Sequence, residues 1–117
     1  MSTTQLALFE APRGMRAPTG YVYFGTDGVN IKIGYSTSPR RRGGELKITQ
    51  LLTFLGGVED ERRHHRIWAR FRIGGSEWFR SDPELLEWLD RHVPQGTRER
   101  MSLRALIFRR QTLATHQ

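Results

Sequence analysis

Residues 20–36 read GYVYFGTDGVNIKIGYS, and this stretch decides the fold. Aromatic and branched residues fill 21–26, and apolar and polar residues alternate over 31–35, so both segments are predicted to be strands. Asp27 and Gly28 between them are a strong signal for a hairpin turn. We therefore expect two neighbouring antiparallel strands that bring a phenol, Tyr23, near an ammonium group, Lys32.

Further elements are predicted on the C-terminal side of this hairpin. Ser38 followed by Pro39 is typical of a helix start, so a short helix should run to about residue 46. A pair of glycines, Gly74 and Gly75, should end the main helix. The other predicted elements are a strand over 48–55, a main helix over 59–72, an extended segment over 77–80, a helix from the capping box 81–84 to about 92, and a basic helix over 98–110.

A length of 117 residues fits one compact domain. Residues 1–18, with their prolines and scattered polar residues, are predicted to be a flexible tail. Residues 19–93 should form the folded domain, and 94–117 a basic C-terminal tail or helix. The predicted fold class is α+β, with a small three-stranded, mostly antiparallel sheet flanked by helices.

The chain is strongly basic, with a net charge of +7 and a sequence pI near 11.0. Of its nineteen basic residues only Lys32 and Lys47 are lysines, and the planar guanidinium of arginine suits bidentate phosphate contacts. A GC-rich genome would also explain the arginine preference. The excess of positive charge itself indicates a polyanionic partner, most simply DNA.

Two function classes are excluded by composition. The chain has no cysteine, so it has neither disulfides nor thiolate metal sites. No apolar run approaches the length of a membrane span, and no signal-peptide pattern begins the chain. We therefore expect no membrane partner and a location in the cytoplasm of a bacterium or of a phage-infected cell.

Several short motifs follow one another in a recognisable order over residues 20–90. The motifs are Val22-Tyr23-Phe24, Ile31-Lys32-Ile33-Gly34-Tyr35-Ser36, Pro39 with Arg42, Glu61 with His65, and Glu77-Trp78-Phe79. Together they resemble the GIY-YIG nuclease superfamily, and in particular its phage-type branch. This resemblance implies a GIY-YIG-like fold and a divalent-metal-dependent endonuclease that hydrolyses DNA.

The resemblance implies catalytic roles for Tyr23, Lys32 and Arg42. Tyr23 would take a proton from the attacking water if nearby cations lowered its pKa. Lys32 stands where the superfamily has its second tyrosine, and beside Tyr23 it would favour the phenolate. Arg42, eight residues after Gly34, would neutralise charge on the scissile phosphate. The alternatives are a half-buried strand tyrosine, a solvated lysine, and a glycine at position 34 that serves only packing rather than close approach.

Glu61 is the implied ligand of Mg²⁺ or Mn²⁺, and His65 would contact phosphate or orient a water. The helix pattern adds independent support, because Glu61, His64, Trp68 and Phe71 share one face whose aromatic members should be buried. A carboxylate at the edge of that face is costly unless it is paired or binds a metal. The alternatives are a salt bridge from Glu61 to an arginine and a structural role for the histidines.

Other positions are given supporting roles by the same resemblance. Arg40, Arg41 and Lys47 would bind DNA backbone phosphates. Glu77, Trp78 and Phe79 form a structural motif whose aromatic residues close the core. Leu46 stands where many members of the superfamily have histidine or tyrosine. Together with Lys32, that replacement keeps a second hypothesis open, a catalytically inactive DNA- or clamp-binding adaptor or inhibitor of phage origin.

The N-terminal tail carries a separate motif, Gln5-Leu6-Ala7-Leu8-Phe9. It resembles the peptide by which bacterial proteins bind the replication sliding clamp. In that mode Leu8 and Phe9 fill an apolar pocket, Leu6 packs beside them, and Gln5 hydrogen-bonds at the rim. The alternative is that these apolar residues fold back on the domain as a latch.

Overall fold

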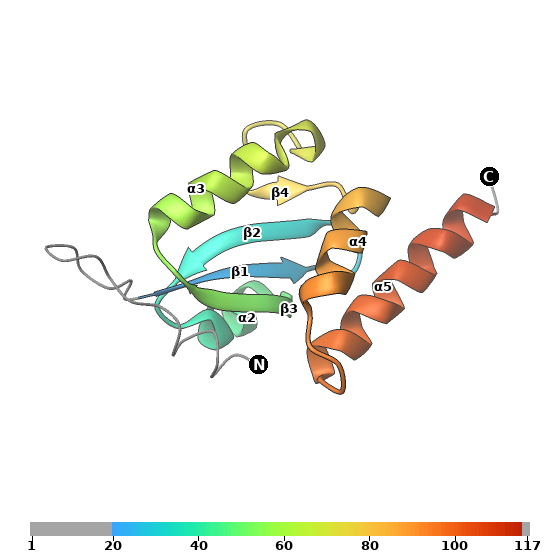
Figure 1. Ribbon diagram of the computed structural model, residues 1–117, viewed down its shortest axis with the longest axis horizontal. Coiled ribbons are helices and arrows are strands. Elements are labelled where there is room, and N and C mark those ends of the chain that lie inside the picture. Colours follow the sequence, from blue (N-terminus) through green and yellow to red (C-terminus); the bar gives the residue numbers. More distant parts are fainter. Residues whose placement is uncertain (1–19, 116–117) are drawn as a thin grey trace, which may run out of the picture.

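The computed structural model describes the backbone of residues 20–115 and all of their side chains except those of 45, 46, 114 and 115. This part of the chain contains one antiparallel sheet of four strands, four α-helices and a 3₁₀ turn (Figure 1). The elements are β1 (Gly20–Thr26), β2 (Ile31–Ser36), α2 (Pro39–Leu46), β3 (Thr49–Gly56), α3 (Val58–Ile67), η1 (Ala69–Phe71), β4 (Trp78–Phe79), α4 (Pro83–His92) and α5 (Arg98–Thr115).

The predicted hairpin is confirmed. β1 and β2 are antiparallel, and Tyr23 lies opposite Gly34 in their register. The turn between them is held by Asp27, whose Oδ1 accepts hydrogen bonds from the backbone N–H groups of Val29 (2.9 Å) and Asn30 (2.8 Å). An aspartate that bonds to backbone groups two and three residues later is the usual reason for its preference in turns.

The sheet has four strands in the order β3-β1-β2-β4 within residues 20–115, so the prediction of three strands was one short. The fourth strand has only two residues, and Trp78 and Phe79 pair with Lys32 and Ile31 of β2. A two-residue strand is too short to show a period-2 pattern, and its pairing with β2 depends on the tertiary fold. The α+β class was predicted correctly.

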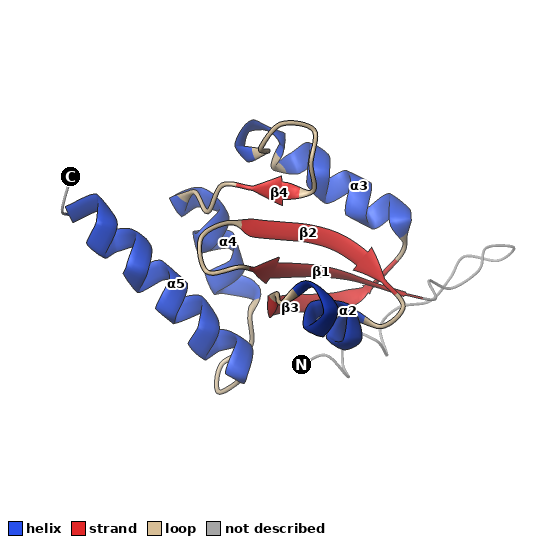
Figure 2. Cartoon of the chain, turned by 180° about the vertical axis from the view of Figure 1, so that it is seen from behind, coloured by secondary structure: helices blue, strands red, loops and turns tan. Residues whose placement is uncertain are grey.

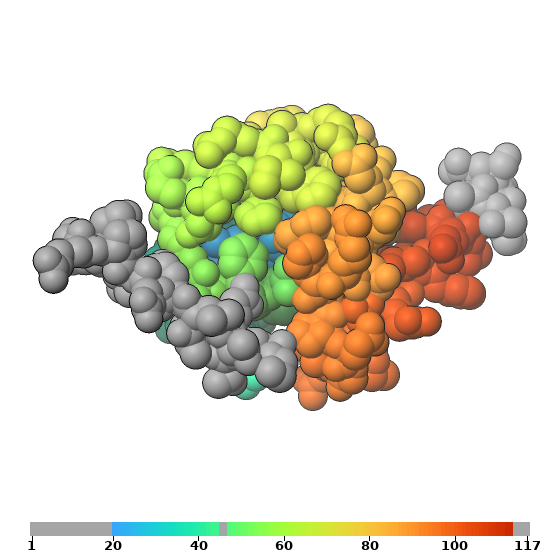
Figure 3. Space-filling view, in the orientation of Figure 1, coloured from blue at the N-terminus to red at the C-terminus, as the bar shows by residue number. Residues whose placement is uncertain are grey.

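Helices cover the two faces of the sheet unequally. α4 lies across the face shown in Figure 1, whereas α2 lies on the opposite face, as Figure 2 shows. α3 and α4 cover much of the first face, and part of the sheet stays visible between them (Figure 3). Most of the apolar core is under these two helices and α5. It is made of Val22, Phe24, Ile31, Ile33, Leu51, Trp68, Phe71, Phe79, Leu85, Leu86, Leu89, Val93, Leu103 and Leu106.

The main helix is shorter than predicted. α3 ends at Ile67 rather than near residue 72, and Trp68 and Phe71 reach the core through the 3₁₀ turn that follows. Both aromatic residues are buried as predicted, but they lie beyond the end of α3. At its start, the backbone N–H of Gly57 donates to Oδ2 of Asp60 at 2.7 Å, which satisfies a terminal donor of this helix.

The predicted capping box at 81–84 is wrong by one residue. Asp82, not Ser81, caps α4, because its Oδ1 accepts a hydrogen bond from the Glu84 N–H at 2.9 Å. Ser81 is buried, and its Oγ donates instead to the carbonyl oxygen of Val29 at 2.6 Å. The serine therefore connects the start of α4 to the β1–β2 turn, a tertiary contact that local spacing does not reveal.

A buried arginine attaches α5 to α4. Arg100 is only 5% exposed, and its guanidinium donates to the Asp90 carboxylate, to the Asp90 carbonyl (2.6 Å) and to the Val93 carbonyl. Leu103 and Leu106 are buried on the same helix. The arginine thus satisfies carbonyl groups at the C-terminus of α4, where a positive charge is also favoured by the helix dipole.

Replacing Arg100 should destabilise the domain. In the Arg100→Ala variant the α4 carbonyls lose their donors, so we expect the free energy of unfolding to fall by about 2 kcal/mol. Arg104→Ala, an exposed position on the same helix, should change it by less than about 0.5 kcal/mol. Urea unfolding monitored by tryptophan fluorescence measures both, and equal losses in the two variants would contradict the role given to Arg100.

Candidate functional site

The site begins where Tyr23 crosses Gly34. A Cβ atom built on Gly34 would lie 2.6 Å from both Cζ and Oη of Tyr23, so the ring occupies the space that a side chain at position 34 would need. Tyr23 is only 1% exposed. Gly34 therefore allows the close approach of the Tyr23 ring, a contact that also fits the alternative of a glycine that serves packing.

The expected lowering of the Tyr23 pKa is not found. Burial raises the pKa of this phenol above its ordinary value of 10.0, although the adjacent Arg42 opposes that rise through a side-chain hydrogen bond and its charge. The negative charges of Glu77 and Glu61 raise the pKa further. Tyr23 is therefore a neutral phenol shielded from solvent, with the exposed residue Arg42 beside it.

Lys32 was expected to favour the phenolate of Tyr23, but its ammonium group pairs with a carboxylate instead. Its Nζ lies 3.1 Å from Oε1 of Glu77 and 5.5 Å from the centre of the Trp78 ring, and the side chain is 13% exposed. Glu77, predicted as part of a structural motif, thus belongs to the charged site. The sequence signal was present, because Glu77 immediately precedes the strand that pairs with Lys32. Phe79 is fully buried, as its predicted role in closing the core requires.

Glu61 projects from the first half of α3 and is partly buried. Burial is the main reason that its pKa is raised from 4.5, and the charge of Glu77 adds to the rise, whereas His65 and Lys32 oppose it. No described cation forms a salt bridge with Glu61 within 4.0 Å, so the alternative of an arginine partner is not realised in this part of the chain. A bound cation would relieve the repulsion between the two carboxylates.

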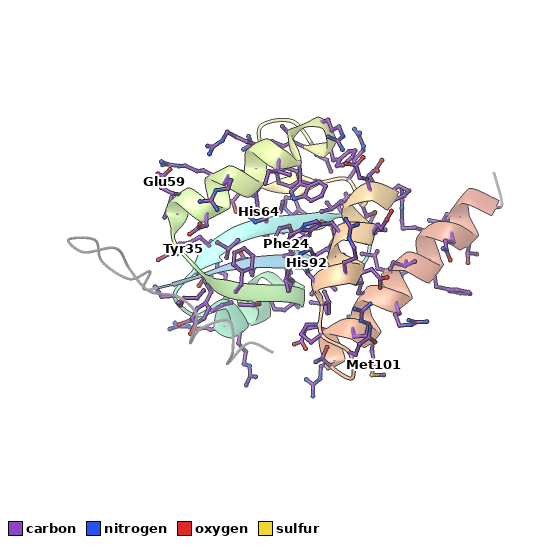
Figure 4. All side chains as sticks on the ribbon, viewed as in Figure 1. Phe24, Tyr35, Glu59, His64, His92 and Met101 are labelled. Carbon is purple, nitrogen blue, oxygen red and sulfur yellow. The ribbon has the colours of Figure 1, made fainter. Side chains whose placement is uncertain are left out.

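His65 and His64 have different surroundings. Nε2 of His65 donates to the Ile33 carbonyl at 2.9 Å and its ring contacts the edge of Phe79, so this residue anchors α3 to β2. His64 points into the core, where its ring lies 5.2–5.5 Å from Phe24, Phe54 and Trp88. Figure 4 shows His64 and Phe24 between α3 and the sheet. Both histidines therefore fit the alternative prediction, in which they have a structural role rather than a role in binding phosphate or water.

The remaining predicted site residues lie around α2 or outside the described part. Arg40, Arg41 and Lys47 are exposed, and Lys47 adopts a left-handed conformation (φ 56°) at the end of α2. The Leu46 side chain lies outside the described side chains. The predicted tail and its motif residues Gln5, Leu6, Leu8 and Phe9 lie outside the described residues. No helix within residues 20–115 is both long and apolar enough to cross a membrane.

Six of the predicted residues therefore form one electrostatically connected group, called here the Tyr23 cluster: Tyr23, Lys32, Arg42, Glu61, His65 and Glu77. They come from β1, β2, α2, α3 and the segment before β4. No set of three or more metal-binding side chains of the His, Cys, Asp or Glu type occurs among the described residues. Any divalent ion held by Glu61 and Glu77 would thus take its other ligands from water and substrate, as Mg²⁺ commonly does.

Comparison with known proteins adds no assignment. No family model matches the chain, and no curated protein or solved structure matches it.

Substitution of Gly34 should displace Tyr23. In Gly34→Ala the new methyl group would collide with the phenol ring, so we expect a loss of about 1–3 kcal/mol in stability. Gly44→Ala is the matched control, because a Cβ there meets no atom within 4 Å and position 44 lies in a helix. Alanine at position 44 should be neutral or stabilising. Thermal unfolding of both variants tests the difference, and a stable Gly34→Ala would refute the close approach.

His64 should make stability depend on pH. Burial lowers its pKa below 6.5, so below about pH 6.5 the unfolded chain binds a proton that the folded protein resists, and stability falls as pH falls. We expect His64→Phe to lose less stability than wild type between about pH 7.5 and about pH 5.5. Urea unfolding at both pH values measures this difference, and identical pH dependence in the two proteins would show that His64 does not contribute.

Proposed function

We propose that this protein is a divalent-metal-dependent DNA endonuclease that hydrolyses phosphodiester bonds, with a GIY-YIG-like domain and the Tyr23 cluster as its active site. The observation that carries the proposal is the position of Tyr23, buried against Gly34, with Arg42 of α2 beside it and Glu61 of α3 near enough for its charge to raise the Tyr23 pKa. A phenol, a guanidinium and a carboxylate supply a proton acceptor, an anion-binding group and a metal ligand. The basic net charge of +7 supports a nucleic-acid substrate.

Arg42 makes the first contact in this mechanism. Its exposed guanidinium would bind a non-bridging oxygen of the scissile phosphate and neutralise charge in the transition state. In doing so it would turn away from Tyr23 and open the buried phenol to the attacking water. Once its own proton has been lost to solvent, Tyr23 would act as a phenolate and accept a proton from that water. The water oxygen bonds to phosphorus, a bridging P–O bond breaks, and the leaving oxygen takes a proton from solvent.

Glu61 and Glu77 are the residues that would hold Mg²⁺ or Mn²⁺. The raised pKa of Glu61, due to burial and then to Glu77, fits a pair of carboxylates that a cation would stabilise. When bound, the ion would polarise the phosphate and favour the ionised forms of nearby groups. Lys32 balances the charge of Glu77, and His65 fixes the helix that carries Glu61 four residues earlier.

Recruitment to DNA is a second part of the proposal. Arg40, Arg41 and Lys47 would follow the backbone without reading sequence. The Gln5–Phe9 peptide would attach the enzyme to a bacterial sliding clamp and thereby raise its concentration at replicating DNA.

The test is nicking of supercoiled plasmid in Mg²⁺ or Mn²⁺ by wild type and by single-residue variants. We expect Tyr23→Phe, Arg42→Gln and Glu61→Gln each to lower the rate by about 100-fold or more. Glu59→Gln and Arg66→Gln are matched controls, because both are exposed on α3, and Figure 4 shows Glu59 pointing away from the domain. The controls should retain the wild-type rate, and chelation of the metal should abolish nicking.

One observation favours the second candidate, a DNA- or clamp-binding adaptor without catalysis. The Tyr23 side chain is almost inaccessible, with 1% exposed, so a protein that never opens it would bind but not cut. That outcome would appear as absent cleavage of supercoiled, single-stranded and branched DNA by a protein that still binds them. Nicking that survives both Glu61→Gln and Tyr23→Phe would instead show that the active site has been misplaced.

A further inference from the structure

A polar groove of about 1070 Å³ lies between α2, β3 and the first turns of α5. Arg40 of α2 and Arg98 of α5 contribute guanidinium groups to its lining, and Tyr21 and Thr53 also line it. Its volume is slightly above the roughly 300–1000 Å³ typical of small-molecule sites, and such sites are mainly apolar. The charged and hydroxyl-bearing lining indicates a polar, anionic ligand of extended shape.

The groove begins next to the Tyr23 cluster. Thr53 is the register partner of Tyr23 on β3, and Tyr21 lies two residues before Tyr23 on β1. Register partners and alternate residues of a strand share one face of a sheet, so Tyr21, Tyr23 and Thr53 lie side by side. Helix α2 contributes a residue to the Tyr23 cluster and another to the groove, because Arg42 interacts with Tyr23 and Arg40 lines the groove.

The groove continues away from Tyr23 into a second hollow of about 300 Å³. Thr49 and Ser102 line both hollows, and Lys47 and Arg109 add cations to the second one. Together the two hollows are called here the basic trough. Its four cations are arranged along its length rather than gathered at one point.

Two carboxylates also line the basic trough, but they do not cancel its charge. Glu99 belongs to the first hollow and Asp27 to the second, against four cations. Asp27 is engaged in the turn, where it accepts two backbone hydrogen bonds. Arg109 donates to the Gly28 carbonyl at 2.9 Å through Nη1, a contact that leaves its charge uncompensated.

We infer that the basic trough binds a single-stranded segment of nucleic acid that continues from the phosphate held at Tyr23. Spaced cations suit a chain of phosphates, threonine and serine hydroxyls can donate to phosphate or sugar, and Tyr21 offers a ring on which a base can stack. A recess between a helix and a strand admits one backbone more readily than a duplex. The direction of the bound strand depends on the proposed function, but binding to the trough does not.

Fluorescence anisotropy in EDTA, where no metal supports cleavage, tests the inference on the full chain. The probes are a labelled oligothymidine of about 20 nucleotides and a duplex of equal length. The double variant Arg40→Gln/Arg98→Gln should bind the single strand on the order of tenfold more weakly, with the salt slope reduced by about 1.4 because two phosphate contacts are lost. Arg66→Gln/Arg104→Gln removes the same charge from exposed positions that line neither hollow, and it should bind as wild type does.

Unchanged single-strand affinity and salt slope in the Arg40/Arg98 variant would overturn the inference, as would equal weakening by the control variant. A larger loss on duplex than on single strand would overturn the single-strand assignment. The nicking assay run in parallel separates the two proposals. Absent nicking with trough-dependent binding contradicts only the proposed function, whereas wild-type nicking with unchanged binding contradicts only the trough.

Discussion

The site depends on one steric constraint, the contact between the Tyr23 ring and the bare backbone of Gly34. That contact lets a phenol lie against the backbone of β2, buried inside the domain. Because Tyr23 is held there, Arg42 of α2 can reach it from one side, and the charges of Glu61 and Glu77 act on it. A side chain at position 34 would displace the ring and with it the common centre of these groups.

The electrostatics of this centre disfavour the ionised forms of Tyr23 and Glu61. Burial and two carboxylates raise the pKa of Tyr23, and burial with Glu77 raises that of Glu61. Groups whose charged forms are disfavoured in this way are typical of functional sites, although structural networks also perturb pKa values. Here Lys32 already compensates Glu77, so the uncompensated carboxylate is Glu61. In the proposed chemistry a bound metal ion would supply the positive charge that offsets these carboxylates, and Arg42 would offset the negative charge of the substrate phosphate.

The rest of the domain holds these elements in place. His65 connects α3 to the backbone of β2, Ser81 connects the start of α4 to the β1–β2 turn, and Arg100 closes the end of α4 against α5. Each is a polar side chain that donates a hydrogen bond to a backbone carbonyl of another element or turn. α5 in turn provides one wall of the basic trough, so the contact at Arg100 also shapes the proposed nucleic-acid surface.

The sequence by itself determined the hairpin and the order of the helices, because turn residues, caps and alternation are local signals. The residues expected around Tyr23 came from the resemblance to a nuclease family rather than from such signals. The sequence also identified Trp68 and Phe71 as core residues through their spacing. The tertiary structure alone decided the partners: β4 became a strand only by pairing with β2, and Lys32 turned to Glu77 instead of the phenol. It also decided the direction in which the Tyr23 pKa shifts, because the effect of burial, which raises this pKa, outweighs the lowering effect of Arg42. Pairing, burial and charge balance depend on residues far apart in the chain, which no local pattern specifies.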